Sequence, residues 1–358
     1  MNGAVENIPS EIVRRLLERG SAVAARAAAH AAEFASSRSE IRQGIERIIL
    51  APEPEMLDAA EGGSLSAVDG ALVCDSKSIG DLCTAVAVRV GPAEGDGDCD
   101  IWMESVSRAP QNKEALSGIM SSMEVTLAAA SEAKVVMMDG SMLSTFINVS
   151  KGLHAARQHG GPLADRIADA RSDAFRDKAM RILTSSRHIA MPKYTTTNEF
   201  AGMLPERFRA YDARTIATMA LRPGEMTHFS FRKTDERDDS RRMLIGPALG
   251  FGKGDAIAFS AALDGVLSCY YRPHPWTPAF RIDMTPAAAD DGDAQLRALR
   301  AVRDSTTASG LREPFPLYLV DLFAKHVSVG AAPIVDMSAL SSIDDPEARL
   351  LLAMGYRT

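Results

Sequence analysis

Three acidic residues of this 358-residue chain stand where they could share one metal site. Asp69 lies in the strand-like run SAVDGALVCD, and Asp139 ends the apolar run AKVVMMDGS just before a glycine. Glu124 lies between them, at the border of the apolar stripe of a predicted helix. Taken singly, each is more typical of a turn or of a solvated helix face. Together they would repel one another unless a divalent cation neutralised them, and an oxygen-only site suits Mg²⁺ or Mn²⁺.

One run of elements would bring these acids together. It comprises strands at 66–75, 81–90 and 101–107, a helix at 111–131 and a strand at 133–141. This β-β-β-α-β order predicts an α/β unit in which an antiparallel meander leads, through a helical crossover, to a strand beside the first one. With the first and fourth strands as parallel neighbours, Asp69 and Asp139 point into one cleft, and Glu124 leans over it.

Helical segments precede and follow this core. Residues 9–49 have helical spacing, interrupted at Gly20 and ended by the prolines of APEPE at 51–55. This preface either packs on the main domain or serves as a docking arm. Residues 142–222 are mostly helical, around a loop or strand edge at 190–200. The later elements are strands at 227–233, 241–246, 255–263, 266–272 and 278–284 and helices at 293–306, 316–329 and 346–354. The expected parts are a helical extension at 1–55, one domain at 60–330 and a tail at 331–358.

The composition is that of a folded, acidic protein. Apolar residues make up 46% and charged residues 24%, which is enough for a sizeable core. The net charge of −7 has the wrong sign for a nucleic-acid binder, although a local basic groove can coexist with it. The four cysteines form no C-x-x-C pair, which argues against a zinc ribbon and fits a reduced compartment. With no apolar signal segment and no apolar run of about 18 residues, we expect a cytoplasmic protein without membrane contact.

Two stretches resemble known binding motifs but lack residues that those motifs require. DGDCD at 96–100 imitates the start of a calcium loop, but Ile101 and Ser107 stand where Gly and Glu are required. GPALGFGKGD at 246–255 hints at a phosphate-binding loop, but Lys253 is followed by glycine and not by Ser or Thr. We interpret these stretches as a hairpin loop and a flexible turn, and predict no nucleotide binding.

Several phrases, in a fixed order, resemble the NurA nuclease family, whose core is RNase H-like. They are AVDGA at 67–71, SSMEVTLAAA with Glu124, MMDGSML at 137–143, MPKYTTTNEF with Lys193, FRIDM at 280–284 and EPFPLYLVD at 313–321. The resemblance runs from about residue 60 to about residue 330. Glu313 departs from it, because the family often has Tyr there. Asp321 occupies a metal-ligand position in place of His, and an aspartate can bind the same metal.

The resemblance implies an RNase H-like mixed sheet and a manganese-dependent nuclease that degrades DNA from 5′ ends and also nicks single strands. The implied ligands of two Mn²⁺ or Mg²⁺ ions, about 4 Å apart on the scissile phosphate, are Asp69, Glu124, Asp139 and Asp321. Lys193 would neutralise charge that develops in the transition state. The implied assembly is a homodimer that works with a HerA-type hexameric ATPase on DNA, in end processing or defence.

Basic side chains late in the chain are candidates for holding the DNA backbone. Arg232, Lys233, Arg241 and Arg242 flank strand-like pieces, although such residues are more often plain surface charge. Arg281 lies within a family-like phrase, which strengthens its candidacy. We predict that four residues contact DNA: Lys193, Arg281, Arg232 and Lys233.

Two other functions stay open. The helical preface and Glu313 are compatible with a non-catalytic adaptor that keeps the RNase H-like fold and docks a DNA translocase. An enzyme that acts on RNA or RNA–DNA hybrids is the third possibility, because nothing in the sequence distinguishes a reader of the 2′-OH. A metal that binds only the folded state should stabilise the enzyme and not the adaptor.

Overall fold

The computed structural model describes residues 10–91, 97–157, 160–193, 198–231, 245–310 and 312–354. The strands within them are β1 (Ile49–Leu50), β2 (Leu65–Lys77), β3 (Gly80–Val90), β4 (Gly97–Val106), β5 (Val135–Asp139), β6 (His188–Met191), β7 (Met226–Thr227), β8 (Ser230–Phe231), β9 (Leu267–Tyr271) and β10 (Phe280–Met284). In the part of the chain so described they form one sheet in the order β1-β7-β9-β10-β6-β5-β2-β3-β4, with β8 beside β9.

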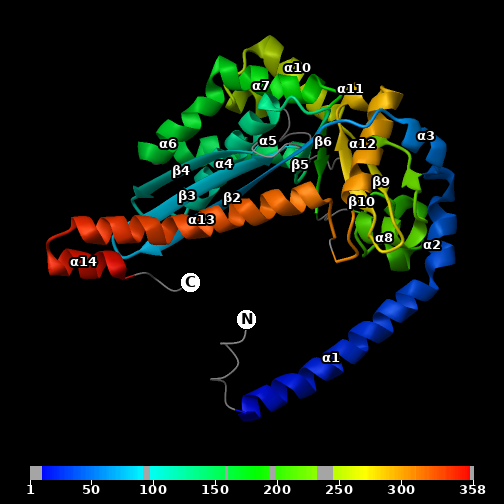
Figure 1. Ribbon diagram of the computed structural model, residues 1–358, viewed down its shortest axis with the longest axis horizontal. Helices are drawn as coiled ribbons and strands as arrows, with labels where there is room; N and C mark the ends of the chain where they lie inside the picture. The colour runs from blue at the N-terminus through cyan, green and yellow to red at the C-terminus, as the bar shows by residue number, and fades with distance from the viewer. Residues whose placement is uncertain are drawn as a thin grey trace.

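Helices cover both faces of this sheet (Figure 1). The α-helices are α1 (Ser10–Ser36), α2 (Arg38–Ile45), α3 (Pro54–Ala59), α4 (Asn112–Ala130), α5 (Met142–Arg157), α6 (Gly161–Ala168), α7 (Asp173–Thr184), α8 (Ala213–Ala220), α10 (Lys253–Asp264), α11 (Pro286–Ala289), α12 (Gly292–Ser305), α13 (Phe315–Ser342) and α14 (Pro346–Ala353). Short 3₁₀ turns are η1 (Glu46–Ile48), η2 (Asp169–Arg171), η3 (Ala201–Met203) and η4 (Glu206–Phe208).

The predicted β-β-β-α-β core is confirmed. Strands β2, β3 and β4 form an antiparallel meander, and α4 leads from it to β5. Strand β5 lies parallel to β2, with Val68 beside Met138, and β6 lies parallel to β5 on its other side. The carboxyl end of β5 therefore meets the middle of the long strand β2, which is where a mixed sheet of this order can hold a site.

The two faces of the sheet bury separate apolar clusters. On one face α4 covers β2 and β3 with a stripe that includes Leu116, Ile119 and Met123. On the other face α13 packs against the same strands through Leu317 and Val320, and α12 contributes to the same cluster. Because α4 and α13 lie on opposite sides of β2, side chains from both can approach the same point on that strand.

The N-terminal extension joins the body at its C-terminal end. None of the residues of α1 is buried, and this helix projects away from the sheet (Figure 1). Phe34 near its end packs on Tyr211 with ring centroids 4.2 Å apart. Arg42 of α2 forms a 2.6 Å ion pair with Glu225, and β1 then pairs with β7. The extension thus supplies an edge strand to the domain, and its first helix contacts the domain near its C-terminal end.

Several expected elements differ in the structure. The stretch 255–263, expected as a strand, is helical within α10, because Ala256, Phe259 and Leu263 recur at helical spacing on a buried face. Gly20 does not interrupt α1, which is continuous. Helix α13 crosses residue 330, where we expected the tail to begin. Residues 241–244 of another expected strand lie outside the described residues.

Helix α13 is long and apolar enough to cross a membrane, by length and composition alone, with a best-window mean hydropathy of 1.2. Its packing supplies another reason for its apolar character. Leu317, Val320 and Ala324 lie along one face and are buried against the sheet. Further along, Asp336 forms a 2.7 Å ion pair with Lys77 at the end of β2. The helix is therefore fastened to the sheet at two separated points.

Removing one of these packing contacts should loosen α13. Leu317→Ala deletes a side chain that is 1% exposed, so we expect the free energy of unfolding to fall by about 2–5 kcal/mol. Phe323→Ala on the same helix, where the ring is 46% exposed, should cost about 0.5 kcal/mol or less. Urea denaturation of both variants measures the difference. Equal losses would show that this face of α13 is not packed as described.

Candidate metal centre

Three aspartates from three separate elements meet beside β2. Asp69 lies in the middle of β2, Asp139 is the last residue of β5, and Asp321 lies in the second turn of α13. One carboxylate oxygen from each lies within 4.8 Å of the others, a grouping that could hold a metal ion. Asp69 is buried and the other two are partly buried. These are three of the four predicted metal ligands.

The local backbone explains why Asp69 and Asp139 face the same space. Val68 pairs with Met138, so the next residue of each strand stands at the same level of the sheet. Each aspartate accepts a hydrogen bond from the following glycine N–H, 2.7 Å for Gly70 and 2.8 Å for Gly140. Gly140 has φ +84°, a value that L side chains rarely adopt. This glycine therefore lets the chain turn away directly after the carboxylate.

Glu124, the fourth predicted ligand, approaches from the opposite face. It lies on α4, is 8% exposed, and stands over Gly70 of β2. A Cβ on Gly70 would lie 2.5 Å from Glu124 Oε1 and 2.7 Å from Met120 Cγ. The missing side chain at position 70 is thus the opening through which Glu124 reaches the neighbourhood of Asp69. Glu124 does not belong to the three-aspartate group, in which all ligand atoms lie within 4.8 Å.

Lys193 lies among the carboxylates, as an ion-pair partner of several of them. It follows β6 by two residues, beside the end of β5. Its Nζ lies 2.8 Å from Asp139 Oδ2, 3.1 Å from Glu313 Oε2 and 3.4 Å from Asp321 Oδ1. Arg214 of α8 donates a hydrogen bond to the Lys193 carbonyl, which fixes the backbone from which this side chain extends.

The crowding of negative charge changes the acidity of the buried groups. Burial, reinforced by the charges of Asp139 and Glu124, raises the pKa of Asp69 to about 9. Burial and Asp139 likewise raise the pKa of Glu124 to about 8. Burial alone would lower the pKa of Lys193, but the surrounding carboxylates, Asp139 first, outweigh it and raise that pKa. The group as a whole therefore favours a bound cation.

Asp321 differs from the other two aspartates because it is also paired on its solvent side. Lys325, one turn further along α13, lies 2.7 Å from its Oδ2. Burial opposes ionisation of Asp321, but Lys325 and then Lys193 outweigh it and hold the pKa of this carboxyl below its usual range. Asp321 is therefore kept ionised, with a charge available to the centre.

The donor set fits a hard divalent cation. Among the described residues the group consists of carboxylates alone, without histidine or cysteine. Mg²⁺ and Mn²⁺ prefer such oxygen ligands, whereas zinc sites normally include nitrogen or sulfur. A divalent ion would also relieve the repulsion that raises the pKa of Asp69. Asp69, Asp139 and Asp321 would hold this ion.

The fold can be compared with known proteins. No protein-family model and no curated protein matches the chain. The NurA nuclease from Sulfolobus solfataricus aligns with 94% of this chain and 99% of its own, with a TM-score of 0.61 at 13% identity. The chain has a NurA-like fold. A second NurA structure and a NurA structure with manganese cover 93% and 92% of this chain and 99% of their own, with TM-scores of 0.54 and 0.53 at 10% identity.

The NurA-like fold puts Arg281 in the interior, where we had predicted a contact with DNA. Its side chain is 3% exposed. Its Nε donates a 2.7 Å hydrogen bond to Asp283, Nη2 donates one of 3.0 Å to Ser268, and Nη1 lies 3.4 Å from Glu199. A guanidinium so enclosed is fully engaged by Glu199, Asp283 and Ser268. Burial thus argues against a direct phosphate contact.

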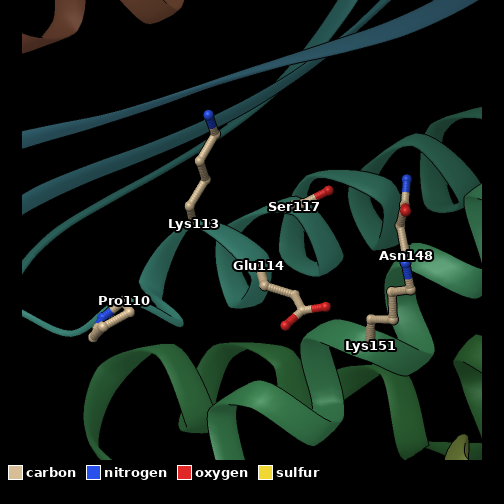
Figure 2. A pocket seen from close by; sticks show the side chains of 6 residues that line it. All are labelled: Pro110, Lys113, Glu114, Ser117, Asn148 and Lys151. Carbon is tan, nitrogen blue, oxygen red and sulfur yellow. The ribbon is translucent and has the colours of Figure 1, made fainter. Parts of the chain in front are cut away.

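The other candidate DNA contacts late in the chain are Arg232, Lys233, Arg241 and Arg242. They fall outside the described residues, so they stay predictions. A surface pocket with two lysines lies between α4 and α5 (Figure 2). Its lining consists of Pro110, Lys113, Glu114, Ser117, Asn148 and Lys151. None of these is one of the predicted site residues, and the pocket is separate from the carboxylate group.

Glu313 lies at this site and is a residue that sequence reasoning missed. In the sequence it is only a departure from the resemblance to the NurA family. It lies just before α13, half-buried, with its Oε2 3.1 Å from Lys193 Nζ. Its residue type gave no signal, because a lone glutamate before a helix is common on surfaces. Its position in the family phrase was the one indication that it belongs here.

The raised pKa of Asp69 makes the stability of the metal-free protein depend on pH. The pKa rises from 3.8 to about 9 in the folded state, so the folded state binds this proton more tightly. With a chelator present, the free energy of unfolding should therefore fall as pH increases from about 4 to about 9. Urea denaturation at pH 5 and pH 8.5 measures the slope, and Asp69→Asn should reduce it. An equal slope in that variant would contradict the electrostatic account of the site.

The opening at Gly70 can be tested by filling it. Gly70→Ala forces Glu124, Met120 or the strand itself to move, so we expect a loss of about 1–3 kcal/mol in unfolding free energy and weaker Mn²⁺ binding. Gly97→Ala is the matched control in β4, because among the described residues its Cβ would meet only Arg89 O, at 3.6 Å. Denaturant melts and Mn²⁺ titrations compare the two. If Gly70→Ala behaves like Gly97→Ala, the opening has no role.

Proposed function

We propose that this protein is a metal-dependent DNA nuclease. The observation that carries the proposal is the group of Asp69, Asp139 and Asp321, whose oxygens lie within 4.8 Å on a NurA-like fold. Similar folds belong to a NurA nuclease and to a NurA structure with manganese, which supports both the activity and the metal. Mn²⁺ or Mg²⁺ is the proposed cofactor, and two ions are the proposed number.

The roles of the chain's own residues follow from their positions. Asp69, Asp139 and Asp321 would hold a divalent ion. Such an ion would supply an activated water and positive charge beside the scissile phosphate. Glu124, buried behind Gly70, contributes negative charge from the other face and completes the proposed ligand set. The Lys193 ammonium, which lies beside these carboxylates, would neutralise charge on the phosphate as the bond breaks.

The finer activity is part of the same proposal. We propose degradation of DNA from 5′ ends, with nicking of single strands, by a homodimer that works with a HerA-type hexameric ATPase. The net charge of −7 supports a role for such a partner, because a chain in which acids outnumber bases is poorly suited to holding a DNA backbone alone. Arg281, which lies in a family-like phrase, is buried in ion pairs. Affinity for DNA would then come largely from the ATPase.

The non-catalytic adaptor is the alternative that one observation favours. Helix α1 extends from the body with none of its residues buried, as a docking arm would. An adaptor needs no metal, so Mn²⁺ would leave its thermal midpoint unchanged. The nuclease should be stabilised by Mn²⁺, since a ligand that binds only the folded state raises the midpoint. A melt with and without Mn²⁺ therefore separates the two functions before any DNA is added.

Loss of one aspartate should abolish cleavage. Asp139→Asn should lower the rate of Mn²⁺-dependent degradation of linear DNA by more than about a hundredfold, because even outer partners of metal ligands typically contribute 10–100-fold. Asp69→Asn should do the same. The measurement is release of acid-soluble nucleotides from end-labelled duplexes, with single-stranded DNA and RNA as further substrates.

A matched control keeps this test sharp. Glu132→Gln removes an acid whose side chain is 85% exposed and which lies next to Arg187, away from the aspartates. Its cleavage rate should equal that of the unaltered protein. Full activity in Asp139→Asn would disprove the assignment of the site. Absent activity in the unaltered protein, together with a melt that Mn²⁺ does not change, would favour the adaptor.

A further inference from the structure

The ion pairs of Lys193 contain a conflict. Two of its three carboxylate partners, Asp139 and Asp321, belong to the group that would hold the metal, at 2.8 Å and 3.4 Å from Nζ. An ammonium and a divalent cation cannot both take the oxygens of the same two aspartates, because their positive charges repel at such separations. In the absence of metal, the Lys193 ammonium therefore serves as the counter-ion of this group.

The third partner resolves the conflict. Glu313 Oε2 lies 3.1 Å from Lys193 Nζ, and Glu313 is not a member of the aspartate group. This oxygen is buried and accepts no hydrogen bond of regular geometry from any residue that the structure describes. A buried carboxylate oxygen without a hydrogen bond is costly, so it favours closer approach of a donor. It can receive the ammonium whenever the aspartates are taken.

The surroundings allow the side chain alone to move. The backbone of Lys193 is fixed by the hydrogen bond from Arg214 to its carbonyl. Glu313 is held directly before buried Pro314, at the start of the helix that carries Asp321. Glu313 and Asp321 are therefore both held in place by the start of α13. A small shift of Lys193 Nζ, from Asp139 toward Glu313, is all that the exchange requires.

We propose that Glu313 is a positioning residue, which holds the Lys193 ammonium beside the aspartates when these bind a divalent cation. The inference rests on the proposed function. A carboxylate at position 313 can compensate the full positive charge of the displaced ammonium, which a neutral side chain cannot do. Glu313 thereby lowers the cost of metal entry and keeps Lys193 next to the place of the phosphate.

The experiment is a double-mutant cycle on Mn²⁺ affinity, read by calorimetric titration and by the Mn²⁺-dependent shift of the thermal midpoint. Glu313→Gln should weaken Mn²⁺ binding roughly three- to tenfold, as expected for one partly buried ion pair. Lys193→Met should tighten it, because the competing ammonium is gone. In the Lys193→Met background, Glu313→Gln should have little further effect. Lys325→Met controls for the loss of a lysine beside Asp321. Lys325 contacts Asp321 from solvent at 65% exposure and has no ion pair with Glu313 among the described residues. In the Lys325→Met background, Glu313→Gln should therefore weaken Mn²⁺ binding as much as it does in the unaltered protein.

The outcomes separate this inference from the proposed function. If the unaltered protein shows no Mn²⁺-dependent stabilisation, the proposed metal centre fails. If Mn²⁺ binds but Glu313→Gln weakens it equally in the presence of Lys193 and in the Lys193→Met background, Glu313 acts as a ligand or a distant charge, and the inference is overturned. Melts in chelator report whether each variant folds. A Glu313→Gln effect confined to the background that retains Lys193 supports the positioning role.

Discussion

Repulsion among carboxylates is the constraint on which the rest of the site depends. Asp69, Asp139 and Asp321 hold oxygens within 4.8 Å of one another, and Glu124 adds a fourth charge from behind. Such a group costs stability unless a cation accompanies it. The structure maintains it by bringing the acids from rigid elements on both faces of one strand, and by placing the Lys193 ammonium against them. Extra packing elsewhere, such as that of α13 on the sheet, offsets the remaining cost.

The sheet order makes this geometry possible. Strand β5 ends beside the middle of β2, so β2 continues past the site and forms one wall of it. Helices α4 and α13 lie on opposite faces of β2, so Glu124 and Asp321 approach this strand from two directions. Because Gly70 has no side chain, the Glu124 carboxylate can lie close against the strand. The group of carboxylates is thus a property of the layered fold, and no short segment of the chain could form it alone.

Local pattern was enough to predict the β-β-β-α-β order and the pairing of Asp69 with Asp139, because both acids end or interrupt apolar strands. Asp321 and Lys193 were predicted from the family resemblance alone. The residues next to them in the sequence give no indication that they contact each other across such a long stretch of chain. The helix α10 was mistaken for a strand because its alanines suit either period. Burial of Arg281 was missed, although Arg281 and Asp283 are two apart on a strand, a spacing that places both on one face and indicates an ion pair.

The origin of Asp321 on α13 has a consequence for protein synthesis. The chain emerges from the ribosome N-terminus first, so β2 and β5 are available long before the helix that carries Asp321 and Glu313. A nascent chain then carries Asp69 and Asp139 without the acid that completes their group. The three-aspartate group is assembled last, by the docking of α13 on a sheet that already exists. Any property that needs all three acids therefore appears only when synthesis of the chain is nearly complete.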